Sequence, residues 1–181
     1  MPFYPAGVVE NIADLTDAGS SCPDTLECVR GDGDGWAFSD TGARFWGRYG
    51  AAGLLLRAPR PDGTPTVLLQ HRAWWSHQGG TWALPGGARD SHESPEEAAV
   101  REAQEEAGLP ADRIVIRGVV VTASASGTDW TYTTVIADAD ELLPVIADRE
   151  STELRWVDQD DVSALPLHPG FAASWQSLRG M

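Results

Sequence analysis

The stretch GARDSHESPEEAAVREAQEEAGL, residues 87–109, is crowded with carboxylates. Between Gly87 and Glu106 it holds Asp90, Glu93, Glu96, Glu97, Glu102, Glu105 and Glu106, and its two arginines are Arg89 and Arg101. Like charges four residues apart on a helix repel each other, which costs about 0.2–0.5 kcal/mol per pair. The stretch therefore either forms a solvated acidic face or holds cations.

The same stretch carries the start and stop signals of a helix. Ser94 is a preferred N-cap, Pro95 suits the first helical position, and Glu97 completes a capping box with Ser94. Gly108 is placed to end the helix in the left-handed conformation. The sequence therefore predicts a helix over residues 95–107.

Three glutamates of the predicted helix share one face, because Glu102, Glu105 and Glu106 lie three and four residues apart. They occupy the C-terminal half, where the helix dipole disfavours negative charge. Only Arg101 is close to them in sequence, so these carboxylates need compensation from outside the helix. Divalent cations such as Mg²⁺ supply it, because they prefer oxygen ligands.

The composition is that of a globular protein. A chain of 181 residues fits one domain with a real core, and a hydrophobic content of 42% with eight tryptophans is typical of a folded protein. The net charge of −14 argues against nucleic acid as the main partner, because a nucleic-acid backbone requires clustered lysine and arginine. A small nucleotide remains compatible with this charge, since metal ions can bridge carboxylates and phosphates.

The N-terminal segment differs from the rest of the chain. Residues 1–34 are mixed and polar and close in GDGDG, which predicts an arm before a domain over residues 35–181. Cys22 and Cys28 are too few for a disulfide framework and lack the partners of a zinc site, so we expect both to be reduced. The sequence shows no signal peptide and no apolar run of membrane-spanning length, which predicts a cytoplasmic protein without a membrane partner. The sequence leaves the oligomeric state open, and a homodimer is one of the alternatives.

The other segments alternate between strand and helix patterns. Strands are predicted over residues 50–58, 66–73, 81–87, 113–125, 130–139 and 152–159, and a second helix over residues 169–179. The segment APRPDGTP predicts a hairpin-type loop between the first two strands. Strands before and after a central helix, with another helix at the C-terminus, predict an α/β fold in which a mixed β-sheet lies between helices.

Residues 87–109 resemble the Nudix box of the Nudix hydrolases. That pattern reads Gly, five residues, Glu, seven residues, then Arg-Glu-apolar-x-Glu-Glu-x-Gly-apolar. It falls on Gly87, Glu93, Arg101, Glu102, Ala103, Glu105, Glu106, Gly108 and Leu109. Seven specified residues match by chance in such a chain on the order of one time in a million. The resemblance extends over residues 43–179 and implies the Nudix-type α/β/α sandwich.

The resemblance implies an enzyme that hydrolyses a nucleoside diphosphate linked to another group. Such enzymes use Mg²⁺, for which Mn²⁺ can substitute, to neutralise phosphate oxygens and position water. Glu102, Glu105 and Glu106 match the metal ligands of the family. The backbone carbonyl of Gly86 matches a further oxygen ligand.

The resemblance also assigns the residues that hold the box together. Arg101 is expected to orient the carboxylates through charge-assisted hydrogen bonds. Glu93 is expected to tie the loop to the helix. Gly87 and Gly108 are structural positions of the motif.

The general base is left open. Glu102 or Glu105 could activate the water, and so could a carboxylate outside the box. Glu153, in ELRWV, aligns with a segment in which MutT-type members carry a further metal-binding glutamate. The alternative is a solvent-facing strand residue, because strand faces alternate and the sequence does not fix the phase.

The segments around the box narrow the substrate class. The NADH-pyrophosphatase signature SQPWPFPxS is absent, as is the proline that marks ADP-ribose hydrolases beyond the box. The chain looks most like actinobacterial MutT-type members described as 8-oxo-dGTP diphosphatases, which release a monophosphate and pyrophosphate in nucleotide-pool sanitation. Two alternatives stay open: a hydrolase of another nucleoside diphosphate derivative, linked to coenzyme A, CDP or a sugar, and a catalytically silent Nudix-fold nucleotide-binding module.

Three residues outside the box are candidate substrate contacts. Arg72, on the strand before the box, either forks onto phosphate oxygens or is a surface arginine. Trp82 either stacks on a base or belongs to the core. His168 lies close to the position at which MutT carries an asparagine that reads the oxidised guanine, although a histidine lacks the paired donor and acceptor of an amide.

Overall fold

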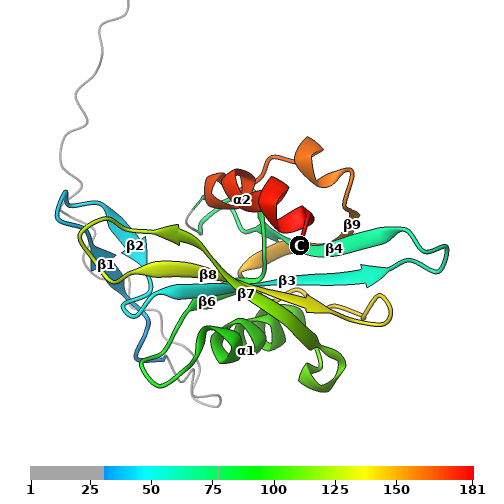
Figure 1. Cartoon of the computed structure of the whole chain (residues 1–181), viewed down its shortest axis with the longest axis horizontal. Coiled ribbons are helices and arrows are strands. Elements are labelled where there is room, and N and C mark those ends of the chain that lie inside the picture. The colour runs from blue at the N-terminus through cyan, green and yellow to red at the C-terminus, as the bar shows by residue number, and fades with distance from the viewer. Residues whose placement is uncertain (1–30, 77) are drawn as a thin grey trace, which may run out of the picture.

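The computed structural model describes residues 31–76 and 78–181 (Figure 1). The predictions for residues 1–30, which include Cys22 and Cys28, lie outside the described residues. The helices are α1 (Pro95–Ala107) and α2 (Pro169–Arg179), with the 3-10 turns η1 (Ala111–Arg113) and η2 (Val162–Ala164). The strands are β1 (Trp36–Phe38), β2 (Arg44–Trp46), β3 (Ala51–Pro59), β4 (Pro65–Arg72), β5 (Trp82–Ala83), β6 (Gly86–Ala88), β7 (Val115–Ser124), β8 (Thr131–Asp138) and β9 (Ser151–Asp158). Neither described α-helix is long and apolar enough to cross a membrane.

A mixed sheet of seven strands forms the centre of the fold. Five strands follow the order β5-β4-β3-β8-β7, while β6 pairs with β3 and β9 pairs with β4. Strands β3 and β8 are parallel, and the other pairs are antiparallel. The loop predicted between the first two long strands joins β3 to β4 as a hairpin, with Arg57 opposite Val67. Strand β6 lies along the N-terminal part of β3, which brings the glycines of the box next to the central strand.

Successive residues of β3 pack into two different hydrophobic cores, one on each face of the sheet. Leu54 and Leu56 pack on the side of α1, whereas Leu55 packs on the side of α2, as the alternation of a strand requires. All three leucines are completely buried. Figure 1 shows α1 and α2 on opposite faces of the sheet. The expected α/β/α sandwich is therefore confirmed.

Helix α1 begins and ends as its sequence predicts. Ser94 accepts a hydrogen bond from the backbone N–H of Glu97, and the Glu97 carboxylate accepts one from the backbone N–H of Ser94. Gly108 has a φ of 67° and closes the helix in the left-handed conformation, which glycine adopts without a Cβ penalty. The helix faces the sheet with small side chains and one carboxylate: Ala98, Ala99, Ala103, Ala107 and Glu106 are buried.

An N-terminal hairpin precedes the sheet and was not predicted. Strands β1 and β2 pair antiparallel, with Trp36 opposite Trp46, and the two rings meet edge to face at 5.2 Å. Each strand has three residues, which is too short to show the alternation that identifies a strand in sequence. The hairpin therefore depends on cross-strand aromatic contact more than on strand propensity.

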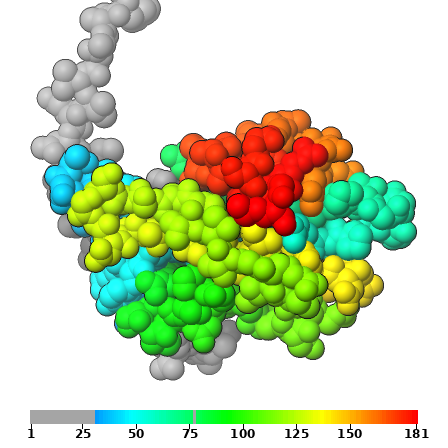
Figure 2. Space-filling model, in the orientation of Figure 1, coloured from blue at the N-terminus to red at the C-terminus, as the bar shows by residue number. Residues whose placement is uncertain are grey.

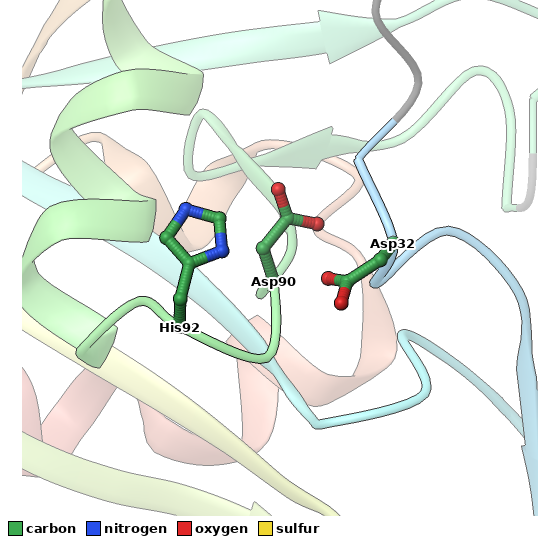
Figure 3. Close-up of side chains that lie close together, drawn as sticks. All are labelled: Asp32, Asp90 and His92. Atoms are coloured by element: carbon green, nitrogen blue, oxygen red, sulfur yellow. The ribbon is translucent and has the colours of Figure 1, made fainter.

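The GDGDG turn before this hairpin packs against the loop that leads into α1 (Figure 3). The backbone N–H of Gly33 donates to Asp90 at 2.7 Å. Ser91 donates to Asp32 through its backbone N–H at 2.9 Å and its hydroxyl at 2.6 Å. His92 lies beside these carboxylates, so that ligand atoms of Asp32, Asp90 and His92 are within 4.8 Å of one another. These bonds attach the N-terminal turn to the loop of the box.

Replacement of Trp175 tests the packing of α2 on the sheet. It is 1% exposed, and its ring lies 5.6 Å from that of Phe171. Trp175→Ala is expected to lower the free energy of unfolding by ~3–5 kcal/mol, because it leaves a cavity in the core. Trp74 is 85% exposed, so Trp74→Ala should change stability by no more than ~0.5 kcal/mol. Urea denaturation measures both variants, and two equally small changes would contradict the placement of α2.

Candidate active site

Arg101 of α1 holds the loop that precedes its own helix. Its Nε and Nη2 pair with the two carboxylate oxygens of Glu93 at 2.6 and 3.0 Å, and Nη2 also donates to the carbonyl of Ala88 at 3.0 Å. Glu93 accepts a further bond from the backbone N–H of Asp90 at 3.0 Å. The bond from Arg101 lowers the pKa of Glu93, so the pair stays charged. One ion pair therefore fixes the loop on the first turns of the helix.

Glu106 is a helix carboxylate held by two strands. It is 5% exposed. One of its oxygens accepts the backbone N–H of Gly86 in β6 at 2.7 Å, and the other accepts the side-chain amide of Gln70 in β4 at 3.1 Å. Burial, reinforced by the nearby charge of Glu102, raises the pKa of Glu106 to about 8. The charged form of this residue is therefore disfavoured unless a positive charge is supplied.

Gln70 extends this contact to the segment before β9. Its amide nitrogen also donates to the hydroxyl of Ser151 at 2.8 Å, and that hydroxyl donates to Asp148 at 3.2 Å. The backbone N–H of Asp148 returns to the carbonyl of Glu106 at 3.3 Å. Gln70 is completely buried. A chain of buried and partly buried hydrogen bonds thus links the box helix to the segment that carries Glu150.

Glu102 and Glu105 lie at increasing exposure beside Arg101. The Nη1 of Arg101 donates to Glu102 at 2.9 Å and lies 3.6 Å from Glu105. The Glu102 side chain is 15% exposed and lies against Gly87, where an added Cβ would come within 2.6 Å of its carboxylate. Burial raises the pKa of Glu102 to about 7, against the opposing effect of Arg101. The Glu105 side chain is 63% exposed.

Strand β6 approaches β3 so closely that position 86 requires glycine. A Cβ on Gly86 would overlap the carbonyl of Ala52 and the Cα of Gly53, and the φ of 156° is unfavourable for other residues. The hydroxyl of Tyr132 lies next to this point, against Gly53. Burial raises the pKa of Tyr132, and the charge of Glu106 acts in the same direction. A neutral phenol therefore borders the carboxylates.

Glu150 belongs to the same electrostatic cluster although the sequence did not single it out. Its charge raises the pKa of both Glu102 and Glu106. Its own pKa is raised by loss of solvation around the carboxylate and then by the charge of Asp148. The positive charge of Arg72, the predicted phosphate contact, acts on the pKa of Glu150 in the opposite sense. In the sequence, Glu150 is recognisable only as an acidic residue directly before a strand. Such residues are common, so this position does not identify a functional residue.

Glu153, predicted as a further metal ligand, has different neighbours. It forms a two-point ion pair with Arg155 at 2.8 and 2.9 Å, and this bond lowers its pKa. In the sheet it lies opposite His71. None of its described contacts reaches a carboxylate of the box. Its role as a ligand stays a prediction, and its pairing with Arg155 lends that role no support.

Trp82 and His168 lie together at the start of α2. Trp82 is buried in the core beneath α2, stacked on His71 at 4.8 Å and covered by Arg155 at 4.6 Å. The backbone N–H of His168 donates to the carbonyl of Trp82 at 2.8 Å. The Nδ1 of His168 accepts the backbone N–H of Gly170 at 3.1 Å and so caps α2. Stacking of a base on Trp82 stays a prediction and requires one of its covering side chains to move.

The arrangement fits a hard divalent cation. The charge of Glu102 raises the pKa of Glu106, and burial deprives both carboxylates of water. A cation with oxygen ligands would replace the lost solvation and remove the repulsion. Sequence reasoning identified these two glutamates but missed Gln70, whose signal was a lone amide within the apolar run of β4.

Known proteins are similar to this chain in sequence and in fold. Over 163 residues the chain is 71% identical to "Putative 8-oxo-dGTP diphosphatase 3" of Mycobacterium tuberculosis. The aligned residues make up 88% of this chain and 75% of that protein. The crystal structure of RenU, a Nudix hydrolase of Mycobacterium smegmatis, is 70% identical and superposes with a TM-score of 0.79 over 82% of this chain and 94% of its own. An Ap4A hydrolase of Caenorhabditis elegans, at 20% identity and a TM-score of 0.59, shares the fold over 73% of this chain and 96% of its own.

The model of the NUDIX domain matches residues 48–178. This segment contains the box, the seven-stranded sheet, α1 and all of α2 except its last residue, whereas the GDGDG turn and the β1–β2 hairpin precede it. The match covers well over half of the chain. The chain therefore belongs to the Nudix family.

Proposed function

We propose that this Nudix hydrolase cleaves a nucleoside triphosphate to the monophosphate and pyrophosphate, with 8-oxo-dGTP as its substrate. The observation that supports this substrate is the 71% identity to the M. tuberculosis protein whose name states that activity. The complete set of box carboxylates supports hydrolysis over the silent binding module. Hydrolysis of a coenzyme A, CDP or sugar derivative is the competing proposal.

The proposed cofactor is Mg²⁺, with Mn²⁺ as a substitute. Glu102, Glu105 and Glu106 would hold it together with the carbonyl of Gly86, and the charge coupling of Glu150 to this group supports that residue as a further ligand. When bound, a divalent cation neutralises phosphate oxygens and lowers the pKa of water. All of the donors are oxygen atoms, which is the preference of Mg²⁺.

The protein's own residues would orient the substrate and move the proton. Arg101 holds Glu102 at 2.9 Å and keeps it on the face of Glu106. Glu102, which Arg101 holds beside the other carboxylates, would accept the proton of the attacking water. Arg72 would contact a phosphate oxygen, because its charge acts on the same cluster. The reaction then needs no covalent intermediate.

The carboxylates can be tested by neutral replacements of similar shape. Glu105→Gln and Glu106→Gln should each lower kcat by at least about 10²-fold, which corresponds to ~2.7 kcal/mol of transition-state stabilisation. Glu150→Gln should lower kcat by at least about tenfold, whereas Glu153→Gln serves as the matched control if Glu150 is the outside ligand. Steady-state assays of pyrophosphate release with Mg²⁺, and again in excess EDTA, measure these effects. Normal turnover in excess EDTA would contradict the proposed requirement for a divalent metal ion.

The raised pKa of Glu106 predicts a pH dependence of stability in metal-free protein. A carboxyl with a folded pKa of about 8 keeps its proton where the unfolded chain has lost it, so the free energy of unfolding falls as pH rises from about 4.5 to 8. Glu106→Gln should remove ~2 kcal/mol or more of that fall. Mg²⁺ should stabilise the wild type more at pH 8 than at pH 5, because binding requires the charged form. Thermal unfolding in EDTA across this range is the measurement, and parallel curves for the two proteins would refute the burial argument.

The substrate can be tested at His168. If this residue reads the oxidised base, His168→Ala should reduce kcat/KM for 8-oxo-dGTP more than for dGTP, by a discrimination worth ~1–3 kcal/mol. If it only caps α2, both values should change alike and stability should fall by about 1 kcal/mol. The ratio of kcat/KM for the two nucleotides in wild type and variant decides. A wild-type ratio near one, or faster turnover of a CDP, coenzyme A or sugar derivative, would refute the proposed substrate.

A further inference from the structure

A cavity of about 300 Å³ lies where the N-terminal hairpin meets the loop of the box and the β7–β8 turn. Arg48 and Tyr49 line it from the turn before β3, Arg89 from the loop of the box, and Thr128, Asp129 and Trp130 from the β7–β8 turn. Figure 2 shows the hairpin, in blue and cyan, against the yellow-green β7–β8 turn on the left side of the molecule. The hairpin contributes Ala37, which lies outside the matched family segment, whereas Arg48 and Tyr49 lie at the start of that segment.

The charged side chains that line the cavity are Arg48 and Arg89 against the single carboxylate of Asp129, so its lining carries a net positive charge. Seven described arginines form ion pairs with carboxylates: Arg57, Arg60, Arg101, Arg113, Arg117, Arg155 and Arg179. Arg89 instead donates to the backbone carbonyls of Tyr49 and Glu93. Among residues 31–76 and 78–181, no group forms a hydrogen bond or ion pair with the side chain of Arg48. In a chain of net charge −14, this pair of guanidinium groups is a local site for an anion.

The unpaired guanidinium is held in place by the backbone around it. The side chain of Arg48 lies on Gly35, where an added Cβ would come within 2.5 Å of Nε and 3.1 Å of Cγ. Its backbone N–H donates to the carbonyl of Gly33 at 2.9 Å. The contact with Gly35 restricts the stem of this exposed side chain, so binding of an anion orders less of it.

Aromatic rings form another part of the wall. Tyr49 is 43% exposed, although its carbonyl is fixed by Arg89 at 3.0 Å. Trp130 is held by its Nε1, which donates to the carbonyl of Trp46 at 3.0 Å, and by Phe45, whose ring lies 4.8 Å away. An exposed ring next to a guanidinium suits a ligand with both a planar base and a phosphate, because every base can stack on an aromatic side chain.

We propose that this cavity binds a mononucleotide. Arg48 contacts the phosphate, Tyr49 stacks on the base, and Asp129 and Thr128 accept hydrogen bonds from the ribose hydroxyls. A volume of about 300 Å³ lies at the lower end of the range for small-molecule sites. The binding requires no divalent cation and does not use the carboxylates of α1. It therefore stands or falls separately from hydrolysis.

The test is isothermal titration of AMP and GMP into the full-length protein in EDTA. Wild type should bind both nucleotides, and Arg48→Ala should weaken the affinity at least about tenfold, because a charged hydrogen bond to phosphate is lost. Arg44→Ala is the matched control: Arg44 belongs to the hairpin that precedes Arg48 and lies 5.2 Å from the ring of Trp36, and it does not line the cavity. This variant should bind within about twofold of wild type.

Two further titrations separate the alternatives. Adenosine should bind at least about tenfold more weakly than AMP, and inorganic phosphate more weakly than either nucleotide, since each lacks one of the two recognised groups. Glu106→Gln should leave AMP affinity unchanged, because the carboxylates take no part. The proposal is overturned if wild type shows no binding at millimolar AMP, if Arg48→Ala binds like wild type, or if Glu106→Gln shifts the affinity as strongly as Arg48→Ala.

Discussion

The buried carboxylate of Glu106 is the constraint on which the rest of the site depends. A carboxylate that loses water must recover hydrogen bonds, and here a strand backbone and a strand amide provide them. Both donors come from the sheet, whereas the carboxylate comes from the helix. The position of α1 on the sheet is therefore set by polar contacts as well as by its alanines. The alanines allow this, because larger side chains on that face would hold the helix away from β6.

A second polar contact fixes the loop that leads into α1. The pairing of Arg101 with Glu93 closes the loop between β6 and α1, and the same guanidinium orients Glu102. The helix, the loop and the strand thus form one rigid frame from which the carboxylates project at graded exposure. Burial, and then repulsion among the carboxylates, raises the pKa of Glu102 and Glu106, and the opposing effect of Arg101 on Glu102 does not cancel the rise. Sites that concentrate like charge in this way are poised to bind the opposite charge.

The predictable parts are those for which a short stretch of sequence determines its own structure. The caps of α1 depend on Ser94, Glu97 and Gly108, which act on backbone within one turn, so the sequence alone located the helix. The long strands were found for the same reason. By contrast, Glu150 acts electrostatically on residues more than forty positions earlier, and Gln70 bonds to a partner on another element. The surroundings of Glu153 depend on strand phase, which only sheet register fixes.

Because the GDGDG turn is attached to the loop of the box, the part of the chain that unfolds cooperatively with this loop includes residues of the turn. The loop between β6 and α1 can open only if the hydrogen bonds of Gly33 to Asp90 and of Ser91 to Asp32 break as well. The free energy of that local opening therefore includes contributions from residues that precede the family segment. Amide exchange in the loop would report on the N-terminal turn, and the smallest unit that folds like the whole protein begins before Arg48.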